Sequence, residues 1–310
     1  MITEPTPAMR TVLERLARED ANVPDPTTLP SAEGRALAER TNTRWNVDLP
    51  ALAQVRETTL AGRRARILVP EHDAGRGAIL FVHGGGFCFC SIDTHERAAR
   101  CLAVEAAAPV VIFDYRLAPE HPCPAGLDDT RAVWPEFAAL YPGRALALAG
   151  DSAGANLALA AMLAGVDPAP ATALLFYGCF GADFDTPSYT LFADGPGLTR
   201  GKMMRYFDWY AAADRRADPL VSPINASDAA LTALPPLYLN AAGMDPLRSD
   251  AEGLAARLHA LGRTDPFDLF EGVVHGFMQM TSVLPEANQA IAKAGAAFRQ
   301  ITQTTTGSET

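Results

Sequence analysis

The chain has 310 residues, of which 48% are hydrophobic, so it can bury a large core in one or two domains, and extensive disorder is excluded. Its formal net charge of −10 argues against nucleic acid and anionic membrane surfaces as partners. The five cysteines are scattered and odd in number, which favours reduced thiols over a disulfide framework or a zinc site.

The first residues carry many charges and lack the apolar stretch of a signal peptide. No apolar run approaches the ~20 residues that span a bilayer. We therefore expect a soluble, cytoplasmic protein without a membrane partner.

Residues 1 to about 45 have helical character. Apolar side chains recur there at helical spacing, at Met9, Val12, Leu13 and Leu16. A second helix is expected over residues 31–40, with Ser31 as its N-terminal cap. Helices that precede the first strand lie outside a central sheet, so we assign this segment to a cap.

Strands and helices alternate from residue 55 onward. A hairpin is expected at residues 55–60 and 64–69, around the turn Ala61-Gly62. The further expected strands are 78–82, 110–114, 145–149, 173–177, 236–241 and 266–270. The expected helices are 98–106, 127–141 (kinked or broken at Pro135), 156–163, 250–261 and 286–301. This order predicts a single α/β domain over 1–310, with a mostly parallel sheet and helices on both faces.

Residues 180 to about 223 interrupt the alternation with an aromatic-rich stretch that lacks a strand pattern. A long connection of this kind is uncommon unless it forms a lid or a binding element. We expect a helix over residues 199–213 and assign about 183–223 to the cap. An ordinary extra helix that packs its aromatic rings into the core is the alternative. The polar residues 302–310 are expected to be a mobile tail.

The segment Gly150-Asp151-Ser152-Ala153-Gly154 lies between an expected buried strand and an expected helix. A strand, a tight turn with G-x-S-x-G and a helix together form a nucleophile elbow, in which the serine sits on a strained turn. The sequence therefore predicts Ser152 as a nucleophile. A structural glycine-rich turn is the alternative.

Three glycines, Gly84, Gly85 and Gly86, follow His83 directly after the expected strand 78–82. Consecutive glycines leave backbone N–H groups free to converge on one point, and H-G-G-G forms the oxyanion hole in lipases and esterases. We expect an oxyanion hole formed by Gly84, Gly85, Gly86 and Ala153, with N–H donors from Gly85, Gly86 and Ala153. A flexible turn is the alternative.

A nucleophilic serine needs a base. In α/β proteins that carry the serine on such an elbow, the acid and then the histidine follow the serine in the chain. Two histidines follow Ser152. His259 falls within a helical pattern, where a partly exposed surface position is expected. His275 falls in a loop after an expected strand, so we predict it as the base.

The orienting carboxylate is expected at Asp245, which follows the expected strand 236–241 in a turn stiffened by Pro246. Asp250 and Glu252 remain alternatives. The position of Asp250 where a helix should start is also explained by a helix cap.

Other polar residues have structural interpretations. Asp151 is expected to support the hydrogen bonding of the elbow, and His83 to anchor its own loop. Asp114, Arg116 and Glu120 are expected to form an ion-pair network that holds residues 115–124.

These motifs resemble those of the hormone-sensitive lipase-like esterases, the bacterial family IV carboxylesterases of the α/β-hydrolase fold. The resemblance spans residues 83–277 in the family's order. It is carried by His83-Gly84-Gly85-Gly86, by the segment 114–122 (DYRLAPEHP), by Gly150-Asp151-Ser152-Ala153-Gly154, by Asp245-Pro246-Leu247-Arg248 and by His275-Gly276-Phe277. The chain departs from the family at Ala155, at Cys123 and at Tyr177-Gly178-Cys179-Phe180, which affects packing and the shape of the pocket.

The resemblance implies an eight-stranded sheet and a cap built from the N-terminal helices plus an insertion after the sixth strand. It also implies that a small-molecule acyl ester of short to medium chain length is hydrolysed without a cofactor or metal. An amidase, lactonase or deacetylase with the same triad is the alternative, and a non-catalytic receptor for small molecules is less favoured. A homodimer is plausible. The candidates for the pocket walls are Phe87, Tyr189, Met203, Tyr206, Trp209 and Phe277.

Overall fold

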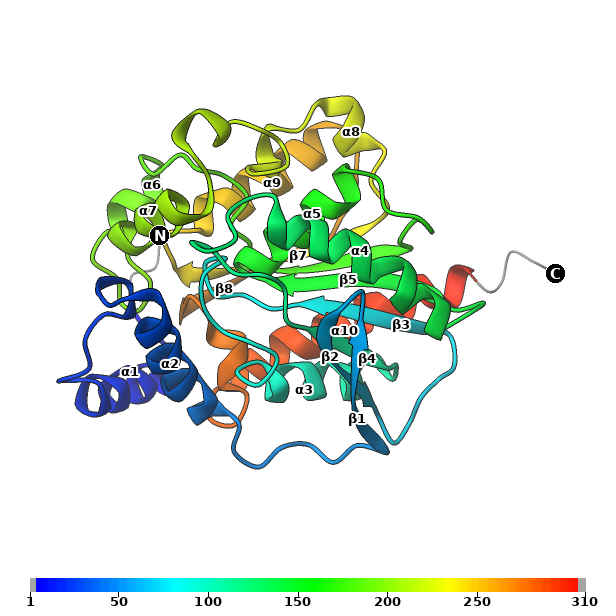
Figure 1. Ribbon diagram of the computed structural model, residues 1–310, viewed down its shortest axis with the longest axis horizontal. Helices are drawn as coiled ribbons and strands as arrows, with labels where there is room; N and C mark the ends of the chain where they lie inside the picture. Colours follow the sequence, from blue (N-terminus) through cyan, green and yellow to red (C-terminus); the bar gives the residue numbers. More distant parts are fainter. Residues whose placement is uncertain (1–3, 306–310) are drawn as a thin grey trace.

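The computed structural model describes residues 4–305 and is built around an eight-stranded sheet (Figure 1). The strand order is β1-β2-β4-β3-β5-β6-β7-β8. Strand β2 is antiparallel to both of its neighbours. The other six strands, in the sheet order β4-β3-β5-β6-β7-β8, are parallel to one another. The strands are β1 (Gln54–Leu60), β2 (Arg63–Val69), β3 (Gly77–Val82), β4 (Val110–Phe113), β5 (Ala145–Asp151), β6 (Thr172–Phe176), β7 (Leu237–Met244) and β8 (Phe267–Val274). The predicted α/β architecture is confirmed.

The β1–β2 hairpin closes through a two-residue turn at Ala61 and Gly62, as predicted. Their φ angles are 47° and 75°, and Leu60 pairs with Arg63 across the turn. Positive φ at both central residues gives a turn whose twist matches that of the flanking strands.

Helices cover both faces of the sheet (Figure 1). One face carries α4 (Ala125–Leu140), α5 (Ala153–Leu163), α8 (Asp228–Thr232) and α9 (Arg248–Ala260), and the other carries α3 (Glu96–Ala106) and α10 (Pro285–Thr305). Trp134 of α4 and Leu157 of α5 belong to one hydrophobic cluster, and Leu102 of α3 and Phe298 of α10 to the other. Two hydrophobic cores therefore hold the parallel strands between them.

Several boundaries differ from the prediction. Helix α4 runs without a break past Pro135, and β8 continues to Val274, four residues beyond the expected end. Helix α10 extends to Thr305, so residues 302–305 of the predicted tail are helical. Residues 306–310 of that tail, and residues 1–3 of the predicted cap, lie outside the described residues.

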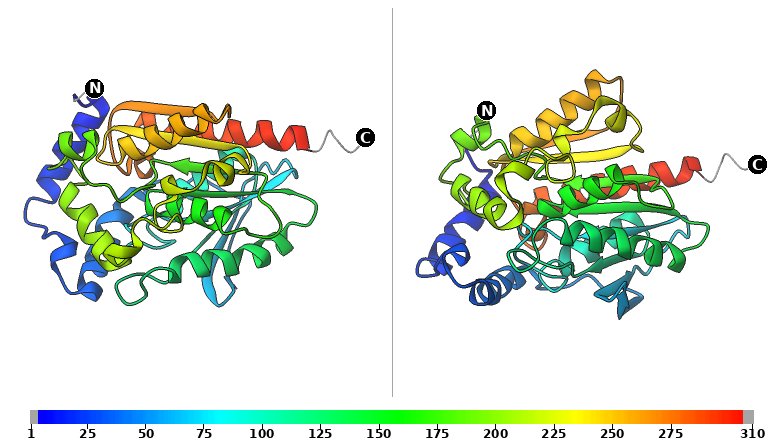
Figure 2. Two further views of the ribbon diagram at one scale, coloured as in Figure 1. Left: turned by 90° about the horizontal axis from the view of Figure 1, so that it is seen from above. Right: turned by 45° about the horizontal axis from the view of Figure 1, so that its top comes forward.

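Two groups of helices lie side by side at the edge of the sheet where the parallel strands end (Figures 1 and 2). We call them the overlying helices: α1 (Pro7–Glu19) and α2 (Ser31–Asn42) from the N-terminal segment, and α6 (Pro187–Leu191) and α7 (Arg200–Tyr210) from the segment after β6. Asp25, which precedes α2, lies 3.8 Å from the Lys202 ammonium of α7. The prediction that Ser31 caps α2 is wrong, because Ser31 is the first helical residue and its hydroxyl donates to Glu120 at 2.6 Å.

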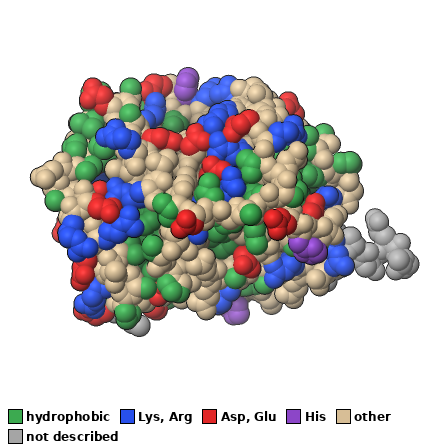
Figure 3. Space-filling model, turned by 90° about the horizontal axis from the view of Figure 1, so that it is seen from below, with side chains coloured by type: hydrophobic (Ala, Val, Ile, Leu, Met, Phe, Trp, Pro, Cys, Tyr) green, Lys and Arg blue, Asp and Glu red, His purple; other side chains and the backbone are tan. Residues whose placement is uncertain are grey.

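The exposed surface carries charges of both signs. On the face in Figure 3, acidic and basic side chains are intermixed rather than separated into patches of one sign. Among the helices within residues 4–305, none combines the length and the apolar character that crossing a bilayer requires.

A buried carboxyl group joins the segment after β6 to α9. Asp250 lies in the first turn of α9, which begins at Arg248, so the prediction that Asp250 caps this helix is wrong. Its Oδ2 accepts the backbone N–H of Gly181 at 2.9 Å. Burial raises the pKa of Asp250 to about 8, with a further upward contribution from the carboxylate of Asp245, although the bond from Gly181 acts in the opposite direction.

Replacing Asp250 with asparagine should remove a loss of stability at high pH. The folded carboxyl stays protonated up to about pH 8, whereas in the unfolded chain it ionises near 3.8. Stability is therefore lost as the pH rises between these values, because ionisation favours the unfolded state. Asparagine keeps an acceptor for Gly181 and cannot ionise. In urea unfolding, the stability gained by Asp250→Asn should grow from near zero at about pH 4 to on the order of several kcal/mol at about pH 8.

Asp214 offers a matched control, because it is exposed on the surface. The same substitution there should change the free energy of unfolding little across this pH range. A pH-independent difference for Asp250→Asn would contradict the assignment of a protonated, buried Asp250.

Candidate active site

Ser152 lies on the tight turn between β5 and α5, as the sequence predicts. Its φ of 54° and ψ of −120° are strained for a residue with a side chain, so the surroundings must hold the turn. The Ser152 N–H donates to the carbonyl oxygen of Phe176 at 2.9 Å. A Cβ at Gly154 would lie 2.0 Å from the carbonyl oxygen of Val82, and one at Gly150 would lie 2.5 Å from the backbone of Gly154. The close packing of strand and helix therefore requires both glycines.

The three side chains predicted for a catalytic triad lie in hydrogen-bonding contact. His275 Nε2 is 2.9 Å from Ser152 Oγ, and His275 Nδ1 is 2.7 Å from Asp245 Oδ2. A carboxylate only accepts hydrogen bonds, so Nδ1–H donates to Asp245 and Nε2 is left to accept the Ser152 hydroxyl. The other oxygen of Asp245 accepts the N–H of Leu247 at 2.8 Å. The carboxylate is thereby held in one orientation while it is fully buried.

Neighbouring parallel strands bring the acid and the base together. Asp245 follows β7 and His275 follows β8, and these two strands pair in parallel. Parallel strands end at the same edge of a sheet, so residues 30 positions apart in the chain become neighbours. The ring of Tyr177, which follows β6, packs edge-on against His275 with centroids 5.0 Å apart.

The alternative residues occupy other environments. His259 is exposed on α9, in agreement with the prediction of a helix-surface position. Glu252 accepts from Arg248 at 2.8 Å, and Asp250 accepts from Gly181. The carboxylate that contacts His275 is that of Asp245.

The glycine-rich loop after β3 contacts the elbow through Gly84. The Gly84 N–H donates to Asp151 Oδ1 at 2.8 Å, so this amide is engaged and cannot serve an oxyanion. The inclusion of Gly84 among the oxyanion-hole residues is therefore wrong for its N–H group. His83 anchors the loop as expected: its Nδ1–H donates to the Gly84 carbonyl oxygen, and its ring stacks on Tyr115 at 4.4 Å. Burial lowers the pKa of His83 to about 3, which keeps the ring neutral.

Three other amides near Ser152 remain free of protein acceptors. Within residues 4–305, no hydrogen bond from the N–H of Gly85, Gly86 or Ala153 is present. Gly85 and Gly86 have φ angles of 120° and 60° and line the same cavity as Ser152. A Cβ at Gly86 would lie 2.4 Å from the ring of Tyr206, so α7 approaches this loop closely.

The predicted network of Asp114, Arg116 and Glu120 is wrong, because these residues bind elsewhere rather than one another. Arg116 pairs with Asp129 of α4 at 2.8 Å, and Glu120 pairs with Arg35 of α2. Asp114 accepts a backbone N–H from the loop after the glycines at 2.8 Å. The loop 115–124 is thus tied to α4 and α2 separately.

Ser152 and His275 open into a cavity of about 470 Å³ beneath the overlying helices. Both groups of overlying helices contribute to its walls. Of the predicted wall residues, Met203 and Tyr206 of α7 line it. Further walls come from Pro26, Ala38, Thr41, Trp45, Phe89, Leu198, Gln279 and Met280.

Four of the six residues predicted as pocket walls do not line this cavity: Phe87, Tyr189, Trp209 and Phe277. Phe87 stacks face to face with Tyr210, with centroids 3.7 Å apart. Tyr189 and Phe277 are fully buried within the two hydrophobic cores. Trp209 lies against the ring of a neighbouring aromatic residue. Their aromatic character therefore serves packing.

The sequence analysis did not predict which residues of the N-terminal segment line the cavity. Thr41 and Trp45 lie at the end of α2 and in the turn after it, and no motif marks them. The signal that could have found Phe89 was its position three residues after the glycines, because that loop must face the nucleophile.

Comparison with known proteins agrees with this geometry. The family described as alpha/beta hydrolase fold matches residues 79–279. The carboxylesterase NlhH of Mycobacterium tuberculosis (strain ATCC 25618 / H37Rv) is 38% identical over 232 residues, which cover 72% of this chain and 73% of that protein.

Solved structures are similar over nearly the whole chain. The ester-hydrolase EH1AB1 from the metagenome of Lake Arreo superposes with a TM-score of 0.88 at 32% identity, covering 96% of this chain and 98% of that chain. An esterase from the bacterial hormone-sensitive lipase family gives a TM-score of 0.86 at 29% identity, covering 96% and 99%. The fold, the serine at its elbow and these relatives together show that the chain is a serine esterase and belongs to the hormone-sensitive lipase-like carboxylesterases of the α/β-hydrolase fold.

Proposed function

We propose that Ser152 is the nucleophile, His275 the general base and Asp245 the orienting acid of this esterase. The observation that carries the proposal is the pair of hydrogen bonds that joins the three side chains, at 2.9 and 2.7 Å. Ser152 Oγ attacks the ester carbonyl carbon while its proton passes to His275 Nε2. Asp245 keeps the imidazole in the required tautomer and stabilises the imidazolium that forms.

The second half of the reaction uses the same groups. The tetrahedral intermediate collapses, and the alcohol leaves with the proton from His275 Nε2. Water then attacks the acyl-enzyme while Nε2 takes its proton, and the carboxylic acid is released as the proton returns to Ser152.

The oxyanion of each tetrahedral intermediate is met by the amides of Gly85, Gly86 and Ala153 in this proposal. Their N–H groups have no acceptor among the described residues and lie near Ser152, and Ala153 also begins α5, whose dipole favours negative charge. Preorganised donors of this kind lower the barrier because they need no reorganisation when charge develops.

The substrate in this proposal is a small acyl ester of short to medium chain length. Apolar side chains such as Trp45, Phe89, Leu198 and Met203 supply walls, and the cavity of about 470 Å³ limits the size of the bound molecule. The overlying helices, from about 1–45 and about 183–223, act as the cap that closes over it.

A fluorophosphonate probe should label the intact protein and fail to label Ser152→Ala. The probe reacts with a serine activated by its base, so labelling reports the nucleophile directly. Ester hydrolysis should fall by at least about 10⁴-fold in the variant, because removal of the nucleophile leaves only binding and the oxyanion hole. Peptide mapping should locate the label on Ser152.

Ser222 is a suitable control, because it is another fully buried serine and has no catalytic partner. Ser222→Ala should keep both labelling and turnover. Labelled Ser152→Ala protein, or a label found at another residue, would refute the assignment.

A panel of p-nitrophenyl esters from acetate to palmitate should give the highest kcat/KM at short to medium chain length, because the cavity has a volume of only about 470 Å³. Met203→Ala enlarges the cavity and should shift the ratio of octanoate to butyrate hydrolysis by about threefold or more towards the longer ester. Met204→Ala provides the matched control, since the adjacent Met204 is 43% exposed and outside the cavity.

The proposed chain-length limit fails if kcat/KM continues to rise up to palmitate. The assignment of the wall fails if both methionine variants change the ratio equally.

A further inference from the structure

A second carboxylate–imidazole pair lies next to the elbow. Asp151 precedes Ser152, and its carboxylate is buried. Oδ1 accepts the Gly84 N–H at 2.8 Å and also lies 3.2 Å from His95 Nε2. Oδ2 lies 3.4 Å from the Tyr177 hydroxyl. One carboxylate oxygen is therefore shared between the glycine-rich loop and an imidazole.

The ring of His95 is held at both nitrogens. Among residues 4–305, the hydrogen-bonding partners of Nε2 are the oxygens of Asp151, so Nε2 carries a proton and donates. Nδ1 lies 2.8 Å from Thr94 Oγ1. The Thr94 hydroxyl donates to the Ser91 carbonyl oxygen at 2.8 Å and accepts the Ser91 N–H at 3.0 Å. The imidazole thus connects Asp151 to the far end of the same loop that begins with the glycines.

The carboxylate of Asp151 is ionised in this environment. Burial acts to raise its pKa, but the charge of His95 and the hydrogen bonds from His95 and Gly84 bring the pKa below the ordinary value. An ionised acceptor binds the Gly84 N–H more strongly than a neutral one would.

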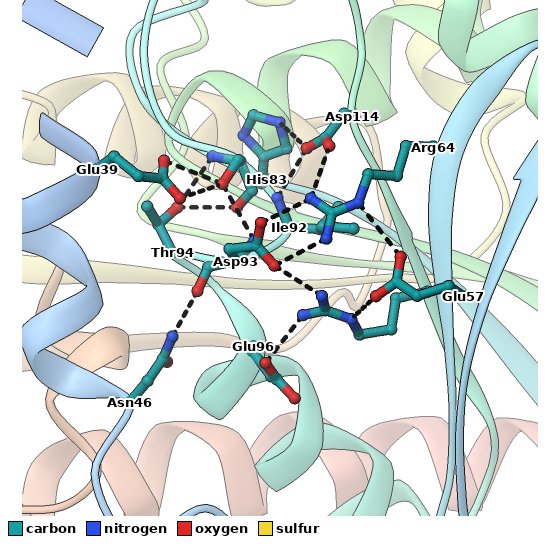
Figure 4. Close-up of polar contacts among 12 residues, drawn as sticks. Glu39, Asn46, Glu57, Arg64, His83, Ile92, Asp93, Thr94, Glu96 and Asp114 are labelled. Carbon is teal, nitrogen blue, oxygen red and sulfur yellow. Dashed lines mark hydrogen bonds and ion pairs between the residues drawn. The ribbon is translucent and has the colours of Figure 1, made fainter. Parts of the chain in front are cut away.

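The loop that follows the glycines is also hydrogen-bonded to α2, one of the overlying helices. Glu39 of α2 accepts the Ser91 hydroxyl at 2.8 Å, and Figure 4 shows this carboxylate directed from α2 towards the loop that carries Asp93 and Thr94. A continuous set of hydrogen bonds therefore extends from α2 through Ser91, Thr94, His95 and Asp151 to the Gly84 amide.

The next two residues, Gly85 and Gly86, have no side chains that could fix their conformation. Both adopt positive φ, and glycine has the greatest backbone freedom of all residues. The hydrogen bond from the Gly84 N–H fixes the peptide plane between His83 and Gly84, and the two following planes, which carry the Gly85 and Gly86 amides, continue from it. Those two planes are also held through their carbonyl oxygens, by His83 Nδ1 at Gly84 and by the Phe89 N–H at Gly85. The Asp151 carboxylate also packs against Gly84, because a Cβ at Gly84 would lie 2.7 Å from Asp151 Oδ2.

We infer that Asp151 and His95 are positioning residues, which hold the amides of Gly85 and Gly86 in the geometry that meets the oxyanion; this inference rests on the proposed function. In this inference they act through the backbone of the loop, although both also border the cavity that contains Ser152. Displacement of catalytic groups by about 1 Å can cost about 10²-fold in rate. Loss of the hydrogen bond between Asp151 and the Gly84 N–H should therefore lower kcat with little change in KM.

His95 allows a test with two matched variants. In His95→Gln the side-chain amide reaches the place of Nε2 and can still donate to Asp151, whereas in His95→Asn it reaches only the place of Nδ1. Per active site, kcat for a p-nitrophenyl ester should stay within about threefold in His95→Gln and fall about 10- to 100-fold in His95→Asn. Affinity for a trifluoromethyl ketone, whose adduct carries an oxyanion, should fall in parallel with kcat/KM.

The number of active sites is counted from the end-point of fluorophosphonate labelling, so misfolded protein does not contribute. A merely structural role would lower this count and leave kcat per labelled site unchanged in both variants, which would overturn the inference. Equal losses of kcat per site in His95→Gln and His95→Asn would overturn it as well. His72→Asn, at an exposed histidine beyond the opposite end of β3, is the control and should behave like the unsubstituted protein.

A second pair keeps the inference testable if His95→Asn does not fold. Thr94→Val removes the hydroxyl that holds Nδ1, and Thr94→Ser keeps it. Only the valine variant should lose kcat per site, by about fivefold or more, and equal rates in the two would count against the inference. Failure of the proposed function looks different, because Ser152→Ala would then retain labelling and turnover.

Discussion

The backbone conformation of Ser152 is the constraint on which the active site depends, at the edge of the sheet where the parallel strands end. A residue with a side chain holds φ of 54° only because β5, α5 and β6 are packed around it, and that packing in turn requires Gly150 and Gly154. The nearest obstacle to a larger residue at Gly154 is the carbonyl oxygen of Val82, at the end of β3. The strand that ends at the elbow and the strand that leads into the glycine-rich loop are therefore in direct contact, so nucleophile and loop have a common support.

The other catalytic residues lie at the same edge of the sheet, without a positive φ angle. Asp245 and His275 extend from adjacent parallel strands, and their hydrogen bond joins the ends of β7 and β8. The carboxylate of Asp151 is hydrogen-bonded to Gly84 and His95 rather than to the triad. The consecutive residues Asp151 and Ser152 thus take part in two separate hydrogen-bond systems.

Much of this arrangement could be predicted because it depends on local chemistry. The Ala61-Gly62 turn, the elbow glycines and the order of serine, acid and histidine are read from neighbouring residues. The errors concern contacts between distant segments. Arg116 pairs with Asp129 rather than with Asp114 or Glu120. This pairing depends on how α4 packs against the loop, which the sequence does not show. Tyr206 lines the cavity whereas Trp209 on the same helix does not, because the rotation of α7 about its axis is set by packing and not by the order of aromatic residues.

The cavity has walls from two segments that lie far apart in the chain, and neither contributes a member of the triad. Substitutions of wall residues in α2 or α7 can therefore change the cavity without removing a group that takes part in proton transfer. The scaffold thus places the walls that select a substrate and the side chains that transfer its protons on different segments of one chain.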